Sequence, residues 1–342
     1  MGEGAMDVLS DTLSVVRLTG AVFFTARFAS PWAIASPPSD TLVRYLQLPS
    51  DCIALFHIVM EGTCVVSIDG ATHATLHAGE IIIFPHGSAH VMGSDVHLKP
   101  TPISDLLPPR PFDGIPLIER GTWDKNARFL CGYLYCDQLF NPLIGALPKI
   151  LVVRQREQGD RMPMRDSEPD VQSNVKTIHM DNWLETTLHY MMQEAHTEQA
   201  GSNVMLVRLT EIMYVEILRR YIQSIGGSER GWLAAVNDPI IGQTLRLLHS
   251  HPERAWTVDE LALAAACSRS TLAQRFTTMI GESPMQYLIA WRMQLAQRLL
   301  KQTNMTASQV AERVGYESVV AFIRAFKRSF GEPPATWRTK YL

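Results

Sequence analysis

The period of hydrophobic and polar positions changes near residue 147. Before it, short runs rich in β-branched and aromatic residues alternate with turn residues, as in many-stranded sandwiches and barrels. The predicted turns are Thr19-Gly20, Glu61-Gly62, Asp69-Gly70 and Ala78-Gly79. The predicted strands are Ser14–Leu18, Ala21–Phe28, Ile53–Met60, Cys64–Asp69, Thr72–His77, Ile81–Phe84, Leu117–Thr122 and Arg128–Tyr135.

After Leu147 the apolar residues recur with a period near 3.6, which predicts helices. Residues 176–197 and 203–224 are expected to form an antiparallel helix pair, separated at Gly201-Ser202. Gly226-Gly227-Ser228 interrupts the pattern and indicates a linker. We therefore expect an all-β domain at 1–147, a helical linker and dimerisation region at 148–225, a linker at 226–238, and a helical domain at 239–342.

The helical domain contains an internal repeat at an offset of 50 residues, which indicates one supersecondary unit used twice. Matched pairs include Ser268 with Ser318, Leu272 with Phe322, Phe276 with Phe326, Gly281 with Gly331, Pro284 with Pro334 and Tyr287 with Trp337. In each copy a short helix, a tight turn and a second helix are expected, the second helix capped by Ser268 or Ser318 and ended by Gly281 or Gly331. This is the helix-turn-helix plan.

An unbroken helical pattern over 284–301 joins the two units. Eighteen helical residues span about 27 Å, near the roughly 34 Å between successive major-groove faces of DNA. Two recognition helices of one chain could therefore enter adjacent turns of the duplex.

Charge is distributed unevenly along a chain whose total is only −3. Residues 239–342 hold 13 Lys and Arg against 7 Asp and Glu, a net of +6, and the remainder holds 18 against 27, a net of −9. A basic segment that coincides with the repeat favours double-stranded DNA as its partner.

The second copy resembles the signature of the AraC/XylS family of transcription regulators. The resemblance rests on the run 311–318 (AERVGYES), followed by Phe322, Arg324, Phe326, Lys327, Arg328, Phe330, Gly331, Pro334 and Trp337. It implies a sequence-specific DNA-binding regulator. At matching positions it implies base contacts by Ser270, Ala273, Gln274, Val319, Val320 and Arg324. The basic residues Arg269, Arg275, Lys327 and Arg328 are better assigned to phosphates. Val319 and Val320 could meet thymine methyl groups but could not donate hydrogen bonds.

The segment 79–90 fits the second cupin motif, G-x5-P-x-G-x2-H, which ends at His90. The resemblance implies a small β-barrel that, in this family, usually senses a ligand. The first cupin motif matches poorly, because Leu55 stands where the metal-binding glutamate is expected and the H-x-H pair is missing. His57 shares the strand face of Leu55, so His57 and His90 could both point into the barrel. An effector site, a divalent metal site and a pair of core histidines all stay open, and no cofactor is expected to be required. Two histidines are fewer than the three protein ligands usual for catalytic zinc.

The five cysteines are too scattered for a disulfide framework, and no CxxC pair indicates a zinc site. Cys131 and Cys136 are candidates for redox sensing, although residues five apart on one strand point to opposite faces. No apolar stretch is long enough to span a membrane and no signal peptide is evident, so a cytoplasmic protein is expected.

The multidomain fold expected is thus a cupin-like barrel, a helix pair and two helix-turn-helix units. The apolar stripe of the helix pair could pack within the chain or form a homodimer interface. A regulator would bind DNA, a small-molecule effector and its own copy, with RNA polymerase as a further candidate partner and no membrane. The alternatives are a cupin-type metalloenzyme with a helical appendage, which the missing first-motif ligands disfavour, and an architectural DNA-binding protein, which would need no sensor barrel.

Overall fold

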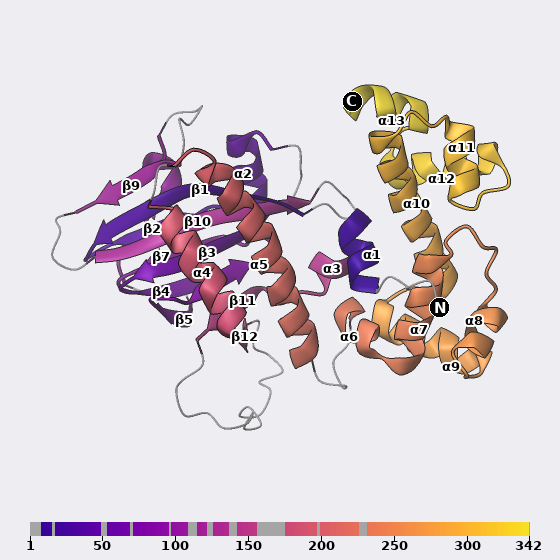
Figure 1. Cartoon of the computed structure of the whole chain (residues 1–342), viewed down its shortest axis with the longest axis horizontal. Coiled ribbons are helices and arrows are strands. Elements are labelled where there is room, and N and C mark those ends of the chain that lie inside the picture. Colours follow the sequence, from indigo (N-terminus) through magenta and orange to yellow (C-terminus); the bar gives the residue numbers. More distant parts are fainter. Residues whose placement is uncertain are drawn as a thin grey trace. The chain divides into compact units, whose positions relative to one another are not determined.

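The computed structural model describes residues 8–15, 18–48, 53–68, 71–95, 97–108, 115–121, 126–136, 142–155, 175–196, 199–225 and 231–341. The chain separates into two compact units (Figure 1). The barrel unit comprises residues 18–137 and 147–224, and the helical unit comprises residues 1–17, 138–146 and 225–342. Both units are therefore assembled from segments that are not contiguous in the sequence.

The barrel unit is built around two β-sheets. Its described strands are β1 (Leu18–Ala29), β2 (Ala33–Ser36), β3 (Ile53–Glu61), β4 (Thr63–Ile68), β5 (Ala71–His77), β6 (Ile81–Phe84), β7 (His90–Gly93), β8 (Thr101–Pro102), β9 (Leu117–Arg120), β10 (Asn126–Cys136), β11 (Ile150–Arg154) and β12 (Val175–His179). The first sheet has the order β12-β11-β6-β3-β10-β1-β9 and the second the order β5-β4-β7-β2-β8. The expected β-barrel is confirmed.

Helices cover the barrel at two places. The short α2 (Ser39–Leu46) follows β2 and contacts β3. The pair α4 (Asn182–Glu194) and α5 (Ser202–Ser224) packs together, and α5 lies against β1 and β12 of the first sheet (Figure 1). Because the first sheet has helices on one face and the second sheet on the other, its central strand β3 is buried at every residue before Glu61.

Two local predictions in the barrel unit are wrong. Of the predicted strand Ser14–Leu18, Ser14 and Val15 end the helix α1 (Val8–Val15), residues 16–17 lie outside the described residues, and Leu18 begins β1. The predicted turn Thr19-Gly20 lies inside β1, where Gly20 pairs with Leu134 of β10. Glycine weakens the interior of a strand but is tolerated there when a partner strand pairs with it. The long partner β10 therefore overrides the local preference.

The strands β11 and β12 were also not predicted. They lie within the region 148–225 that the sequence assigned to helices, and residues 176–179 of the predicted helix 176–197 belong to β12. Leu151, Val152 and Val153 are all buried in β11. A short, wholly apolar run has no period that separates a buried strand from a helix, so only its pairing with β6 decides its conformation.

The helical unit contains α1, α3 (Pro142–Gly145), α6 (Trp232–Asn237), α7 (Pro239–Ser250), α8 (Val258–Ala264), α9 (Arg269–Ile280), α10 (Pro284–Gln302), α11 (Ala307–Arg313), α12 (Val319–Phe330) and α13 (Pro334–Tyr341). The helix α1 packs on α7 and α10, and α6 falls within the linker predicted at 226–238. No helix among the described residues is long and apolar enough to cross a membrane.

Local sequence fixes the ends of the repeated helices as predicted. Thr257 and Thr306 each form a capping box at the start of α8 and α11. Ser268 and Ser318 accept a hydrogen bond from a backbone N–H in the first turn of α9 and α12, and these two helices end at left-handed Gly281 and Gly331. The pairs α8–α9 and α11–α12 are therefore two helix-turn-helix units, joined by α10.

Each helix-turn-helix unit is stabilised by a core of aromatic and aliphatic side chains. In the second unit Phe322 and Phe326 are fully buried and Trp337 packs edge-on against Phe326. In the first, Leu272 and Phe276 are fully buried. The predicted core positions Ile280 and Phe330 are half-buried, because they lie in the last turn beside the capping glycines.

Candidate functional site

The helices α9 and α12 present their first turns to solvent. Ser270 and Gln274 are exposed on α9, and Val320 and Arg324 are exposed on α12. Ala273 and Val319 are half-buried. Since Leu272 and Phe322 hold the opposite face in the core, the predicted base-contact positions lie on or beside the solvent-exposed face of each helix.

Val320 is an apolar side chain in an unusual place. Its exposed fraction is 59%, at the second residue of α12. The Ser318 cap starts the helix at Val319, and Phe322 fixes which face is buried, so Val320 must point outward. An exposed aliphatic residue at the start of a recognition helix is suited to a thymine methyl group.

The four basic residues assigned to phosphates differ in their partners. Arg269 forms an exposed ion pair with Asp259 at 3.3 Å between Nη1 and Oδ2. Arg275 donates from both Nε and Nη2 to Asp238 Oδ2. Lys327 is exposed and Arg328 lies near the phenol of Tyr316. Only Arg275 of these four is therefore engaged by a buried carboxylate.

Sequence reasoning did not identify Asp238. Its Oδ1 accepts from the backbone N–H groups of Ile240 and Ile241 and so caps α7, and its Oδ2 holds Arg275 of α9. Burial opposes the charged form, but the bonds from Arg275 and the two N–H groups prevail and lower the pKa of Asp238. The dipeptide Asp238-Pro239 is a recognisable helix start. Its partner, 37 residues later, has no local signal.

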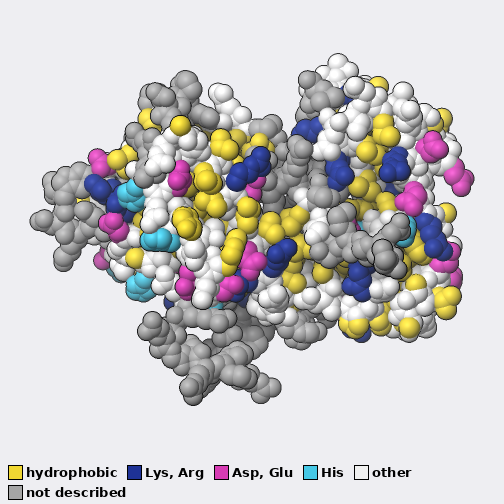
Figure 2. All heavy atoms as spheres, viewed as in Figure 1, with side chains coloured by type: hydrophobic (Ala, Val, Ile, Leu, Met, Phe, Trp, Pro, Cys, Tyr) yellow, Lys and Arg dark blue, Asp and Glu magenta, His cyan; other side chains and the backbone are white. Residues whose placement is uncertain are grey.

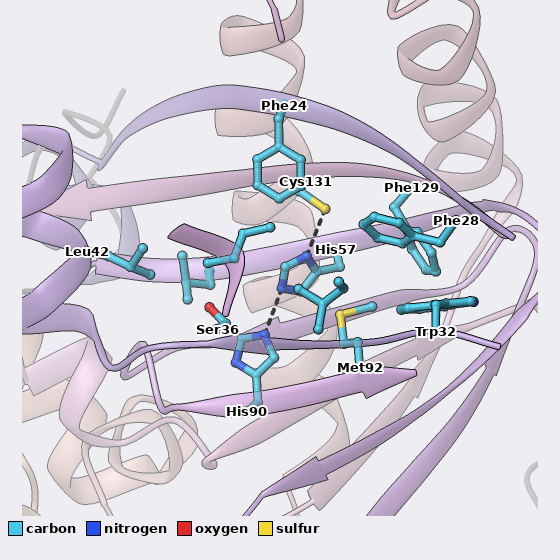
Figure 3. A pocket seen from close by; sticks show the side chains of 13 residues that line it. Phe24, Phe28, Trp32, Ser36, Leu42, His57, His90, Met92, Phe129 and Cys131 are labelled. Carbon is cyan, nitrogen blue, oxygen red and sulfur yellow. Dashed lines mark hydrogen bonds between the residues drawn. The ribbon is translucent and has the colours of Figure 1, made fainter. Parts of the chain in front are cut away.

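In the barrel unit, strand register brings three chemically active side chains together. His57 of β3 lies directly opposite Cys131 of β10, and His90 of β7 lies opposite Ser36 of β2. The sheets of β3 and β7 face each other, so His57 and His90 meet in the interior with 2.9 Å between their Nε2 atoms (Figure 3). Both histidines are buried, as expected for side chains that point into the barrel.

The hydrogen-bond partners of His57 and His90 determine the tautomer of each ring. Burial lowers the pKa of His90 to about 4 and lowers that of His57 as well, so both rings are neutral near pH 7. His90 Nδ1 donates to the Ser88 carbonyl oxygen at 2.8 Å, which leaves its Nε2 as an acceptor. His57 Nε2 therefore donates to His90, and the Cys131 thiol donates to His57 Nδ1 over 3.0 Å. We refer to these residues as the Cys131–His57–His90 chain.

Comparisons with known proteins match both parts of the chain to known families. A family model described as "Cupin" matches residues 7–166 and 171–223, and one described as "Helix-turn-helix domain" matches residues 261–340. A putative AraC-like transcription regulator of Streptomyces lividans is 30% identical over 334 residues, which cover 97% of this chain and 98% of the relative. The chain belongs to the AraC-like transcription regulators.

Other relatives of similar length carry regulator names. The HTH-type transcriptional regulator AlkR of Acinetobacter baylyi is 28% identical over 97% of this chain and 99% of its own. The RCS-specific HTH-type transcriptional activator RclR of Escherichia coli is 28% identical over 98% of each chain. The solved DNA-binding domain of AdpA in complex with a target DNA is 36% identical and covers 30% of this chain and 93% of its own, with a TM-score of 0.29.

This AraC-like regulator does not have the donor set of a cupin metal site at its histidine pair. Every ring nitrogen of His57 and His90 is used in the hydrogen bonds just described, and Cys131 lies on the Nδ1 side of His57, away from His90. Among the described residues no group of three or more His, Cys, Asp or Glu side chains is arranged to hold a metal ion. The described residues at the histidine pair therefore do not fit a divalent metal ion.

Of the two candidates for redox sensing, the structure describes the side chain of Cys131 only. Burial raises the pKa of the Cys131 thiol, so it stays protonated and is a poor nucleophile. Cys136 ends β10, and its side chain lies outside the described residues. Redox sensing by this pair stays a prediction.

Proposed function

We propose that the helical unit of this transcription regulator reads double-stranded DNA through the first turns of α9 and α12, with a small-molecule sensor in the barrel. The observation that carries the DNA part is the pair of capped recognition helices, each with a buried aromatic face and an exposed first turn. The base contacts are assigned to Ser270, Ala273, Gln274, Val319, Val320 and Arg324.

Phosphate contacts are assigned to Arg269, Lys327 and Arg328, which extend from exposed positions on the recognition helices. Arg275 is also assigned to a phosphate contact. In addition, its bond to Asp238 holds α9 against the start of α7. The 19 residues of α10 correspond to about 28 Å of helix, comparable to one turn of the duplex.

Fluorescence anisotropy with DNA from upstream of the regulator's own gene, and with random DNA, tests this proposal. Arg324→Ala should weaken binding to the specific site by about 1–3 kcal/mol and relax the base preference at one position. Lys327→Ala, a basic residue three positions later, should weaken binding to both DNAs and reduce the salt slope by about 1. Equal loss on both DNAs for Arg324→Ala would instead make Arg324 a phosphate contact.

The sensor is assigned to the interior around His57 and His90, which are the effector-binding candidates. Their side chains line a cavity together with Phe24, Phe28, Trp32, Ile34, Ser36, Leu42, Leu55, Met92, Ile103, Phe129 and Cys131 (Figure 3). An apolar cavity with a few polar groups is the usual form of a small-molecule site.

We also propose that the regulator is a homodimer through α4 and α5. These helices expose Trp183, Tyr190, Val204, Met205 and Ile212, all between 45% and 66% exposed, and Figure 2 shows apolar side chains gathered over this helix pair. Other residues of both helices are buried, and α5 packs on β1 and β12 while α4 packs on α5. A patch of this kind on a soluble protein is typical of an interface.

Sedimentation velocity at micromolar concentration tests the dimer. Ile212→Glu should produce a monomer, because it places a charge in the apolar patch. Gln223→Glu adds the same charge at an exposed position of the same helix and should leave the dimer intact. A wild-type monomer that occupies one full DNA site would contradict the proposal.

The remaining assignments follow from the regulator family. The chain is proposed to act without catalysis and without a required cofactor, in the cytoplasm, with RNA polymerase as a candidate partner. The saturated nitrogens of the histidine pair support the non-enzymatic reading over the metalloenzyme alternative. Metal analysis of untagged protein tests this assignment, and a stoichiometric metal lost in a His57→Ala/His90→Ala variant would contradict it.

A further inference from the structure

A second space adjoins the barrel cavity beside α2. The inner chamber contains the Cys131–His57–His90 chain, and the outer chamber is lined by residues of α2, β2, β8 and the segment after it. Ser36, Leu42 and Ile103 line both chambers. The two chambers therefore adjoin, with these three residues in the wall that they share.

The sizes of the chambers limit the ligand. The volume open to the centre of a water-sized sphere is about 40 Å³ in the inner chamber and about 210 Å³ in the outer one. One water needs about 10–15 Å³ by this measure. The inner chamber alone holds only a few non-hydrogen atoms, so a ligand with about ten must extend into the outer chamber.

The lining excludes charged ligands. None of the described residues that line the two chambers is Asp, Glu, Lys or Arg. The two histidines are neutral and their ring nitrogens are already hydrogen-bonded to each other, to Cys131 and to Ser88. A charged group in this space would lose its hydration without finding a partner, which is unfavourable.

One polar group beside the inner chamber lacks a partner. The Nε1–H of Trp32 is buried without a hydrogen bond, and the residue is only 3% exposed. Trp32 packs between Phe28 and Phe129, with ring centroids at 4.8 and 5.3 Å. Figure 3 shows these rings at one end of the chamber and Leu42 at the other, with His57 and His90 between them. A buried donor of this kind is rare in native proteins, and leaving it unpaired is unfavourable.

We propose that the chambers bind a small, uncharged, largely apolar molecule that carries one hydrogen-bond-accepting oxygen, which pairs with Trp32 Nε1. A ketone, ester or ether with a ring or short chain has this chemistry. The apolar part of the molecule lies among Met92, Ile103 and Leu42 and extends toward α2. This inference rests on the proposed sensing role of the barrel and names the class of its ligand.

Isothermal titration of the full-length protein with three matched probes tests the proposal. Acetophenone offers a carbonyl oxygen, ethylbenzene has nearly the same shape without it, and benzoate carries a charge. Acetophenone should bind about three- to tenfold more tightly than ethylbenzene, as expected for one hydrogen bond. Benzoate should not bind measurably. Binding of benzoate as tight as that of acetophenone would overturn the proposal.

Two variants locate the site. Trp32→Phe keeps an aromatic ring but removes the N–H, and should make the affinities for acetophenone and ethylbenzene equal. Trp256→Phe, the same change in the helical unit, removes an N–H that donates to the His251 carbonyl oxygen and should leave the preference unchanged. Leu42→Trp places a large ring between the chambers, since Leu42 lines both, and should abolish binding of both neutral probes even if Trp32→Phe does not fold. An unchanged preference in folded Trp32→Phe, or normal binding in Leu42→Trp, would overturn the proposal.

DNA binding measured with and without acetophenone separates this inference from the sensing role. A probe that binds as described, but leaves DNA affinity and transcription unchanged, supports the ligand class and contradicts the role of the chambers as a sensor. A protein that binds DNA specifically, but binds neither neutral probe, contradicts the ligand class alone.

Discussion

The neutral, buried histidines show how single residues connect chemistry to stability in this regulator. The pKa of an unperturbed histidine is 6.5, and burial lowers that of His90 to about 4. Between these values the unfolded chain binds a proton that the folded barrel does not bind. Neutral His90 therefore contributes fully to the free energy of unfolding above about pH 6.5, and this contribution is lost as the pH falls toward 4.

We predict that acidification from pH 6.5 to 5 lowers the free energy of unfolding of the barrel unit. The slope should approach about 1.4 kcal/mol per pH unit for each of His57 and His90. Urea denaturation at several pH values measures it, and His90→Gln, which does not titrate in this range, should reduce the slope. A wild-type stability that is constant from pH 6.5 to 5 would contradict the assignment of both rings as neutral.

Val320 allows a test of base reading that needs no charged group. Replacing thymine by uracil in the operator removes only the C5 methyl group, and a lost methyl contact costs about 0.8 kcal/mol. We predict that at one position this replacement weakens binding of the wild type and leaves binding of Val320→Ala unchanged. Arg324→Ala should keep the sensitivity to uracil. Anisotropy with single-uracil operators measures the effect, and its absence at all positions would remove Val320 from the base contacts.

At the scale of elements, the two helix-turn-helix units differ in the turn that joins their helices. Gly315 forms this turn in the second unit at a φ of +82°, and a Cβ there would lie 2.6 Å from Glu253 Cα. The corresponding residue of the first unit, Ala266, has a φ of +53°. The first turn thus tolerates a side chain, and the second requires glycine because the chain passes close to the segment before α8.

We predict that Gly315→Ala lowers the free energy of unfolding of the helical unit by more than 2 kcal/mol, because it adds a backbone clash to the left-handed penalty of about 1–2 kcal/mol. The matched control is Gly281→Ala, at a φ of +91°, where a Cβ meets no atom within 4 Å and only the conformational penalty remains. Thermal denaturation followed by circular dichroism compares the two variants. Equal losses would show that the close approach to Glu253 is relieved by a shift of the chain.

At the scale of the whole molecule, the chain order and the compact units do not coincide. The N-terminal helix α1 belongs to the helical unit, where Val8 and Thr12 are buried and the helix packs on α7 and α10. The chain then forms most of the barrel, returns for residues 138–146, completes the barrel and ends in the helical unit. Residues at the start of the sequence therefore stabilise the part of the regulator that binds DNA.

We predict that removal of residues 1–15 lowers the melting temperature of the helical unit and changes that of the barrel unit little. The free energy of unfolding of the helical unit should fall by roughly 1.5–3 kcal/mol for each buried side chain that is removed, such as Val8 or Leu9. Differential scanning calorimetry measures both transitions. Removal of residues 1–7 alone leaves α1 in place and serves as the control. A helical unit of unchanged stability without α1 would contradict this role.

The sequence by itself determined the helix-turn-helix units and the ends of their helices. A Ser or Thr cap, a capping glycine and a buried stripe are set by residues within about four positions of each other, so local interactions fix them. Most barrel strands were also predicted, because alternation is local. The prediction that His57 and His90 point into the barrel followed from strand alternation in the same way.

Only the tertiary structure decided features that join distant segments. The pairing of β11 with β6, the contact of Cys131 with His57 over 74 residues, and the bond of Arg275 to Asp238 depend on which strands and helices become neighbours. The cavity and the unpaired Trp32 N–H likewise exist only once two sheets and α2 close around them. Local sequence therefore determines the helix-turn-helix units of this regulator, whereas long-range packing determines the chemistry of its barrel.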